Sequence, residues 1–142
     1  MQENTDNIIQ DNGPNPYVVN VEELTLQNEN YRTTAWTGKY LQMTLMTIKP
    51  GEDIGLEVHE DHDQFLRLEQ GTARVDMGPT ENDLTSWKAQ ADYAIFVPAG
   101  KWHNVTNTGT QNMKLYSIYA PAEHPHGTIH VTKEDALNDE ND

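Results

Sequence analysis

The sequence of 142 residues contains no cysteine. Disulfide bonds, thiolate metal sites and a cysteine nucleophile are therefore excluded. Basic residues are also scarce, with 9 Lys and Arg against 23 Asp and Glu, which gives a formal net charge of -14. Because proteins hold phosphate groups with Lys and Arg, this balance disfavours binding to nucleic acid and to anionic membrane surfaces.

Long apolar runs are missing as well. No stretch approaches the roughly 20 residues that a membrane-spanning helix needs. Residues 1–13, MQENTDNIIQDNG, lack the basic start and the apolar middle of a secretion signal. We therefore expect a soluble, cytoplasmic protein, and at this length we expect one domain.

Short runs rich in β-branched and aromatic residues fill the middle of the chain, and Gly or Pro separates them. This spacing predicts an all-β sandwich or barrel. The expected strands are residues 31–37, 40–48, 56–59, 64–69, 72–77, 94–97, 105–107 and 114–120. Residues 78–92, GPTENDLTSWKAQAD, are predicted to be the longest loop, and no helix of useful length is expected in the middle of the chain.

The two ends of the chain differ from the middle in composition. Residues 1–15 are rich in Asn, Asp and Gln and are predicted to form a polar arm, which leaves residues 16–131 for the barrel. Residues 132–142 form an acidic tail, in which Thr132 and Asp135 have the spacing of a capping box. This spacing predicts a short helix in the tail.

Four polar residues are expected to meet at one mouth of the barrel. In the expected strand 56–59, Glu57 and His59 share a face, because side chains alternate along a strand. Gln64 begins the interior face of the next strand, beyond a short corner, and His103 would arrive from a facing strand. A carboxylate, two imidazoles and an amide oxygen suit a first-row divalent ion such as manganese, iron, nickel, cobalt or zinc.

Two stretches of the sequence resemble the motifs of a known family. Residues 98–107, PAGKWHNVTN, match the second motif of the cupin superfamily, PxGxxHxxxN. Residues 57–71, EVHEDHDQFLRLEQG, resemble the first motif, and residues 116–127, YSIYAPAEHPHG, resemble the closing segment of small single-domain bacterial cupins. The resemblance implies a double-stranded β-helix, or jelly-roll, barrel that holds one divalent metal ion and forms a homodimer.

The first motif departs from the family pattern at two positions. Gln64 stands where the family has a glutamate, and Glu57 stands at the first histidine position, while His59 and His103 take the other two. If Glu57 reaches the metal, the lost charge is restored; otherwise His59, Gln64 and His103 make a three-point site. His62 is the alternative to Glu57 as the remaining ligand.

Other roles for these residues stay open. Glu57 is a ligand, a catalytic general base beside the metal, or a salt-bridging residue at the rim. Gln64 is a ligand or a buried amide satisfied by the backbone. We expect Asn107 to fix the turn by hydrogen bonds to the backbone. A surface loop is expected around the C-terminal histidines, His124, His126 and His130.

The resemblance implies a class of site, and the fold does not determine the reaction. We favour a metal-dependent enzyme of dioxygenase type that acts on a small enediol or oxyacid. The alternative is a non-catalytic small-molecule-binding or sensor protein, followed by a metal-free dimeric scaffold. A sugar-phosphate isomerase ranks lower, because few basic residues lie near the motif strands. A homodimer also agrees with the aromatic outer faces that Phe65 or Trp102 would give their strands.

Overall fold

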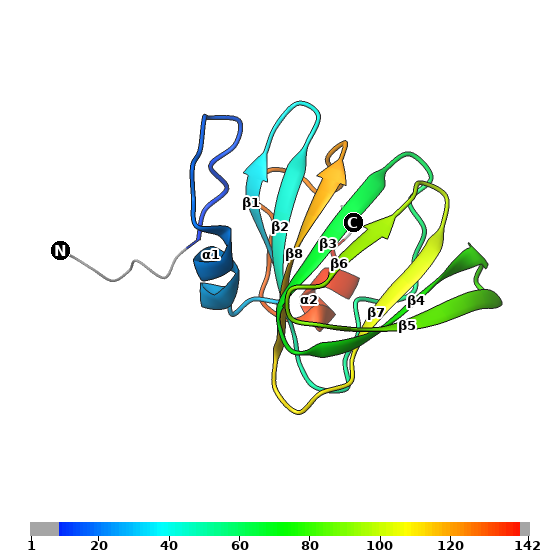
Figure 1. The fold of residues 1–142 in the computed structure, drawn as a ribbon. Helices are drawn as coiled ribbons and strands as arrows, with labels where there is room; N and C mark the ends of the chain where they lie inside the picture. The colour runs from blue at the N-terminus through cyan, green and yellow to red at the C-terminus, as the bar shows by residue number, and fades with distance from the viewer. Residues whose placement is uncertain (1–8, 140–142) are drawn as a thin grey trace.

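The computed structural model describes residues 9–139, and nine strands and two short helices occur in this part of the chain (Figure 1). The strands are β1 (Arg32–Thr37), β2 (Gln42–Ile48), β3 (Asp63–Gln70), β4 (Thr72–Thr80), β5 (Asp83–Gln90), β6 (Ala94–Val97), β7 (Trp102–Asn107), β8 (Met113–Ala120) and β9 (Ile129–His130). The helices are α1 (Val21–Gln27) and α2 (Lys133–Leu137).

The strands form two antiparallel sheets that face each other (Figure 1). The larger sheet has the order β6-β3-β8-β2-β1-β9, and the smaller one has the order β5-β4-β7. Strands distant in the sequence are neighbours in both sheets, as in a jelly roll. This arrangement confirms the predicted all-β, double-stranded β-helix architecture.

The core lies between the two sheets, because each strand turns alternate side chains inward. Along β3 the buried positions are 64, 66 and 68, and along β7 they are 103, 105 and 107. The same alternation that buries Leu66 and Leu68 therefore also buries Gln64, and His103 shares its face with Val105. Gln64 of the first motif and His103 of the second thus lie on the inner faces of opposite sheets.

The predicted loop at residues 78–92 is wrong. β4 continues to Thr80, and β5 returns antiparallel to it from Asp83. The strands approach so closely at Gly78 that a β-carbon there would lie 1.8 Å from the carbonyl oxygen of Asp83. Most residues of β5 are exposed, and the polar–apolar alternation by which sequence reasoning recognises a half-buried strand is interrupted by the polar pair Thr85-Ser86.

The expected strand at residues 56–59 is not formed either. This segment makes a single antiparallel bridge, in which Glu57 pairs with His103. It lies beside β7 without belonging to a named strand.

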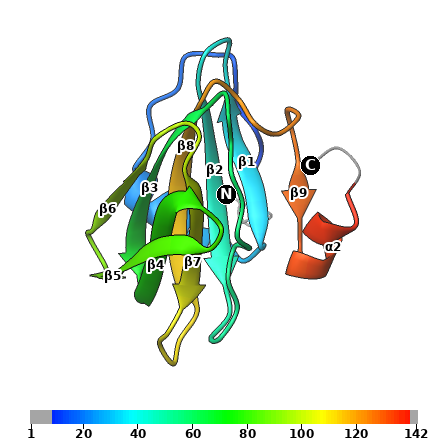
Figure 2. The ribbon, with the colours of Figure 1, turned by 90° about the vertical axis from the view of Figure 1, so that its right-hand side faces the viewer.

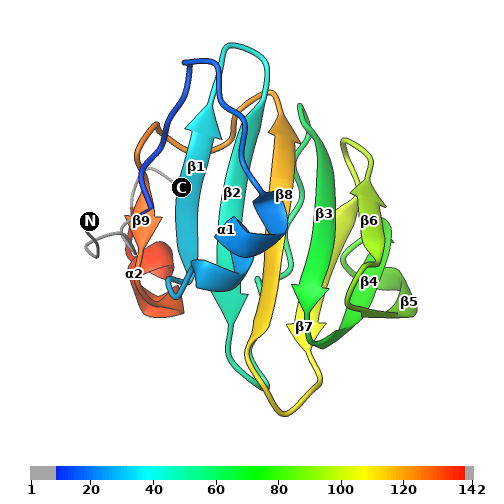
Figure 3. The ribbon, with the colours of Figure 1, turned by 60° about the vertical axis from the view of Figure 1, so that its left-hand side comes forward.

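Helix α1 was not expected from the sequence. Its N-cap is Asn20, whose side chain accepts a hydrogen bond from the backbone amide of Glu23. The helix packs on the outer face of the larger sheet, against β8 and β3 (Figure 3). At its C-terminal end, Lys114 of β8 donates hydrogen bonds to the carbonyl oxygens of Leu26 and Asn28, at 3.0 and 2.6 Å.

Both ends of the described chain contact β1. The side chain of Asp11 accepts a hydrogen bond from the backbone amide of Thr37, and β9 pairs with β1 over two residues. The predicted capping box of Thr132 and Asp135 is confirmed, and it begins α2, which lies beside β9 (Figure 2). The division into an arm, a barrel and a tail stays a prediction, and residues 1–8 and 140–142 lie outside the described residues.

None of the helices among residues 9–139 has the length and apolar character needed to cross a membrane.

Asn107 fixes the end of β7, as the second motif predicts. Its side chain is buried and donates hydrogen bonds to the carbonyl oxygens of Ile48 and Gln111, at 2.8 and 2.9 Å. Its Oδ1 accepts a hydrogen bond of 2.9 Å from the backbone amide of Gly109. One amide side chain thus joins β2, β7 and the turn that leads to β8.

We expect Asn107→Ala to lower the free energy of unfolding by about 2–3 kcal/mol, because the substitution leaves buried backbone groups without partners. Urea denaturation of the variant and of wild type measures the difference. Asn82→Ala, at an exposed position in the turn between β4 and β5, is the matched control and should leave the unfolding midpoint unchanged. Equal midpoints for all three proteins would contradict this role.

Candidate metal centre

Two backbone hydrogen bonds hold the first-motif segment against β7. The amide of Glu57 donates to the carbonyl oxygen of His103 at 3.0 Å, and the amide of His103 donates to the carbonyl oxygen of Glu57 at 2.9 Å. The turn before β7 adds a third bond, from the amide of Gly100 to the carbonyl oxygen of His59 at 2.8 Å. Gly100 has a φ of 83°, which explains the glycine at this position of the motif.

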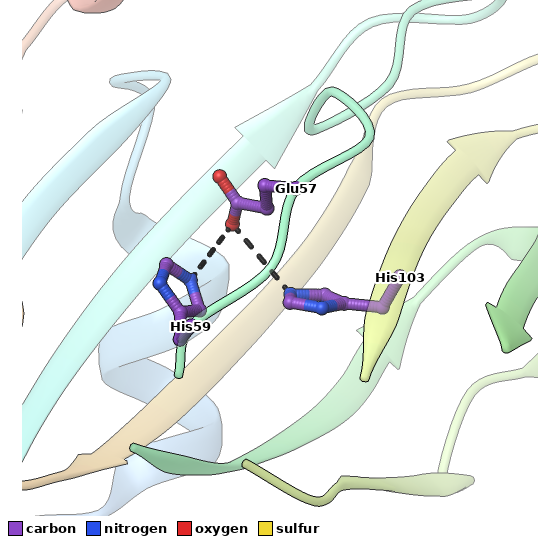
Figure 4. A group of neighbouring side chains, drawn as sticks. All are labelled: Glu57, His59 and His103. Carbon is purple, nitrogen blue, oxygen red and sulfur yellow. Dashed lines mark hydrogen bonds and ion pairs between the residues drawn. The ribbon is translucent and has the colours of Figure 1, made fainter. Parts of the chain in front are cut away.

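This backbone pairing brings three side chains together (Figure 4). Oε1 of Glu57 lies 3.1 Å from Nε2 of His59 and 3.6 Å from Nε2 of His103. One ligand atom of each residue lies within 4.8 Å of the others, and the two imidazole rings have centroids 5.4 Å apart. The carboxylate stands between the two rings (Figure 4).

The ring of His103 is oriented for use of its Nε2. Its Nδ1 donates a hydrogen bond of 3.1 Å to the carbonyl oxygen of Lys101, which leaves the lone pair on Nε2. The residue is only 1% exposed, and within the described part of the chain Nε2 has no hydrogen-bond partner. A buried nitrogen that makes no hydrogen bond is costly, so a ligand for it is expected.

The two separations from the carboxylate of Glu57 are close to those that one metal ion requires. With bonds of about 2.0–2.2 Å, two neighbouring ligands of a single ion stand about 3–3.5 Å apart. The observed separations from Glu57 are 3.1 and 3.6 Å. Two imidazoles and one carboxylate are also a donor set that first-row divalent metals accept. The residues therefore fit a divalent ion.

Gln64 lies on the inner face of β3 and is 4% exposed. Its Nε2 donates a hydrogen bond of 2.8 Å to Oγ of Ser117. Its Oε1 is buried and has no hydrogen-bond partner among the described residues, so the expected backbone partner for this oxygen is not found. Gln64 on β3 pairs with Tyr119 on β8. The ring of Tyr119 packs edge-on against that of His59, with centroids 5.8 Å apart.

His62 does not join the group of Glu57, His59 and His103. The centroids of the His62 and His59 rings are 5.7 Å apart. Nε2 of His62 donates a hydrogen bond of 3.0 Å to the carbonyl oxygen of Ala122. Of the two alternatives for the remaining ligand, Glu57 lies in the group with His59 and His103, and its role as a ligand stays a prediction.

The charges of Glu57 and His59 stabilise each other. Burial disfavours the charged carboxylate, but the contacts with His103 and His59 outweigh this effect and lower the pKa of Glu57 to about 2. Burial also acts to lower the pKa of His59, and the hydrogen bond and charge of Glu57, with the charge of Glu123, outweigh burial and raise that pKa.

A pocket of about 230 Å³ opens beside the group. Its walls come from the first motif, the closing segment, the start of β1 and the α2 region; they include Tyr31, Arg32, Glu57, His59, Glu123 and Leu137. Burial raises the pKa of Tyr31 to about 12 and also raises the pKa of Tyr119, so both phenols remain protonated near neutral pH. The volume suits a small molecule.

Sequence reasoning missed the contribution of the closing segment. Oε1 of Glu123 lies 3.5 Å from Nδ1 of His59. The surface loop expected for the C-terminal histidines is wrong for two of them, because His124 is 7% and His130 is 3% exposed. His124 packs against Tyr119, and His130 pairs with Asp139 at 2.7 Å. No regular spacing in the sequence predicts these contacts, because the chain after β8 is largely irregular.

Comparisons with known proteins agree with the fold and the motifs. The profile of the family described as "Cupin domain" matches residues 44–119. The "Uncharacterized protein YrkC" of Bacillus subtilis (strain 168) is 54% identical over 131 residues, which cover 92% of this chain and 70% of that protein. The protein belongs to the cupin family.

Solved structures extend the comparison. The crystal structure of BH2720 from Bacillus halodurans has a TM-score of 0.91 and 53% sequence identity, and the match covers 92% of this chain and 100% of that one. A protein from Thermotoga maritima described as a predicted oxalate decarboxylase has a TM-score of 0.51 and 18% identity, covering 57% of this chain and 66% of that one. The second likeness concerns the fold alone.

The ion pair predicts how the stability of the metal-free protein depends on pH. The contribution of Glu57 is present above its ordinary pKa of 4.5 and is lost as the pH falls toward about 2. The contribution of His59 is present below its ordinary pKa of 6.5 and is lost as the pH rises through the raised value. We therefore expect the pair to stabilise the fold most between these two ordinary values.

Urea unfolding with a chelator present, on both sides of this pH window, measures the effect. Glu57→Gln should flatten the pH dependence at both ends. Glu60→Gln, an exposed acid-to-amide change three residues away, should keep the wild-type profile. Identical profiles for Glu57→Gln and wild type would contradict the ion pair.

Proposed function

We propose that the protein is a divalent-metal-dependent enzyme of dioxygenase type that acts on a small enediol or oxyacid. One observation carries the proposal. A carboxylate and two imidazole nitrogens, from Glu57, His59 and His103, converge within 4.8 Å of one another beside a pocket of about 230 Å³. The pocket gives a small molecule access to the same point.

The type and number of donors favour an ion with open coordination positions. Two histidines and one carboxylate form the ligand set that is typical of non-haem iron oxygenases, and imidazole also suits manganese, nickel, cobalt and zinc. We propose Gln64 as a further, weaker ligand, because its buried Oε1 has no other partner in the described part of the chain. An amide is neutral, so the carboxylate of Glu57 supplies the negative charge of the set.

When bound, the ion would supply a Lewis acid with open positions and, as iron or manganese, redox chemistry. The residues of the chain would prepare the site for it. Glu57 holds its charge at neutral pH, because its pKa is lowered to about 2. His103 keeps Nε2 available by donating Nδ1–H to the backbone. Tyr31 and Tyr119 are buried, protonated phenols near the group, and the ring of Tyr119 packs against that of His59.

The charge of the pocket disfavours a sugar phosphate as the substrate. Among the described residues that line the pocket, Arg32 is the only lysine or arginine, while Glu57, Glu123 and Asp139 are acidic. A phosphate dianion would meet more negative than positive charge there. A small substrate that chelates the metal through its oxygen atoms and carries one negative charge or none suits this pocket better.

Metal analysis of protein purified without chelator tests the proposal. We expect about one divalent ion per chain in wild type. His103→Ala should lose the ion, because it removes the most buried nitrogen of the set, and Gln64→Ala should weaken binding without abolishing it. His126→Ala, whose side chain is 54% exposed, is the matched control and should bind as wild type does.

Oxygen uptake with a panel of small enediols and oxyacids then tests the reaction. Turnover by wild type, and none by His103→Ala, is the expected result. Bound metal without turnover would favour the alternative, a non-catalytic binding or sensor protein. Protein that takes up no divalent metal under any loading condition would leave only a metal-free scaffold.

We also propose that the protein forms a homodimer through the outer face of β6, β3 and β8. Phe65 stacks edge-on against Phe96, with centroids 5.1 Å apart, and lies 6.0 Å from the ring of Tyr116. Phe96 is 69% exposed. Phe65 and Tyr116 are half-buried, and an exposed aromatic ring supported in this way is typical of a surface that another protein covers.

Light scattering at micromolar concentration checks the dimer. Enough salt should be present to screen the net charge of -14. We expect a dimer for wild type and a monomer for Phe96→Glu, because the substitution places a charge in the aromatic cluster. Trp87→Glu, at a 48% exposed position on β5, should remain dimeric. A monomeric wild type would contradict this assembly.

A further inference from the structure

The ring of His59 has a carboxylate on each side. Its Nε2 faces Glu57, with Oε1 at 3.1 Å, and its Nδ1 faces Glu123, with Oε1 at 3.5 Å. Glu57 lies next to β7, whereas Glu123 follows β8 in the closing segment, more than sixty positions later in the chain. The two nitrogens of the His59 ring therefore contact carboxylates from two separate parts of the structure.

We propose that Glu123 is a positioning residue of the metal centre. A histidine that binds metal through one nitrogen usually donates its other N–H to a carboxylate or a carbonyl, which fixes the tautomer and the plane of the ring. Glu123 would accept Nδ1–H of His59, as the carbonyl oxygen of Lys101 accepts Nδ1–H of His103. Both imidazoles would then present Nε2 to the ion. This inference rests on the proposed metal-binding function.

The position of Glu123 is fixed by a buried amide side chain. Gln42 of β2 is completely buried, and its Oε1 accepts hydrogen bonds from the backbone amides of Glu123 and His124, at 3.0 and 2.9 Å. Its Nε2 donates to the carbonyl oxygen of His124 at 2.7 Å. The backbone that carries Glu123 is thus bound to the larger sheet and does not depend on the metal ligands for its place.

His62 also contacts the carboxylate of Glu123. Nε2 of His62 lies 3.4 Å from Oε1 of Glu123, the same oxygen that faces His59. The side chain of Glu123 is 22% exposed, and it lines the pocket. The hydrogen bond of that His62 nitrogen goes to the carbonyl oxygen of Ala122, so His62 adds a longer contact with Glu123 beside the site without being a ligand.

Zinc and cobalt binding to the full-length protein test the inference by calorimetry. Glu123→Ala removes the acceptor for Nδ1–H, and we expect it to weaken metal binding about 10–100-fold. Glu123→Gln retains an acceptor oxygen without the charge, so we expect a smaller loss. Glu60→Gln is the matched control, an exposed acid-to-amide change beside His59, and should bind as wild type does.

Nitrogen NMR of the zinc-loaded protein shows whether Glu123 acts by orienting the ring of His59 or only by its negative charge near the site. Wild type and Glu123→Gln should show His59 protonated at Nδ1 and bound through Nε2. Glu123→Ala should lose this single signature, and its cobalt form should have an altered visible spectrum. Thermal unfolding of the metal-free variants checks that both fold.

The outcomes distinguish this inference from the proposed function. If both Glu123 variants bind zinc as tightly as wild type, while His103→Ala loses it, the positioning role is overturned and the metal centre stands. An unchanged Nδ1 signature in Glu123→Ala also overturns the positioning role. If wild type itself binds no zinc or cobalt, the proposed function fails, and this inference fails with it.

Discussion

The reciprocal hydrogen bonds between the backbones of Glu57 and His103 determine the geometry of the candidate site. They fasten an irregular segment to the edge of β7, where the smaller sheet would otherwise end. Two residues paired in this way have neighbouring α-carbons, so their side chains leave the backbone close together. The carboxylate of Glu57 and the ring of His103 thereby converge, and His59, two residues after Glu57, completes the group.

Much of the barrel could be predicted from the sequence, because its strands are half-buried. The alternation in β3 and β7 marks an inner face, and the glycine and proline residues mark the turns. β5 could not be recognised in this way, since it exposes most of its residues and exists by pairing with β4. Helix α1 is short, and its one clear signal is the pair of Asn20 and Glu23 at the N-terminal end.

The site was predictable to a similar extent. His59, His103 and Glu57 follow from motif spacing, and the structure places them together although the expected strand at residues 56–59 is absent. The choice between Glu57 and His62 needed coordinates, because it depends on where a short corner turns. Glu123 was out of reach of sequence reasoning, since its contacts arise from an irregular segment held by Gln42, which lies on a strand far earlier in the chain.

The wall of the pocket is assembled from two sources that can change independently. The barrel provides Glu57 and His59, while Ala136 and Leu137 come from the short helix after the last strand. A related protein that kept the barrel and exchanged this final helix would retain the same donor atoms and enclose a differently shaped space. The shape of the pocket would then differ between such relatives through α2, while the chemistry of the donor atoms stayed the same.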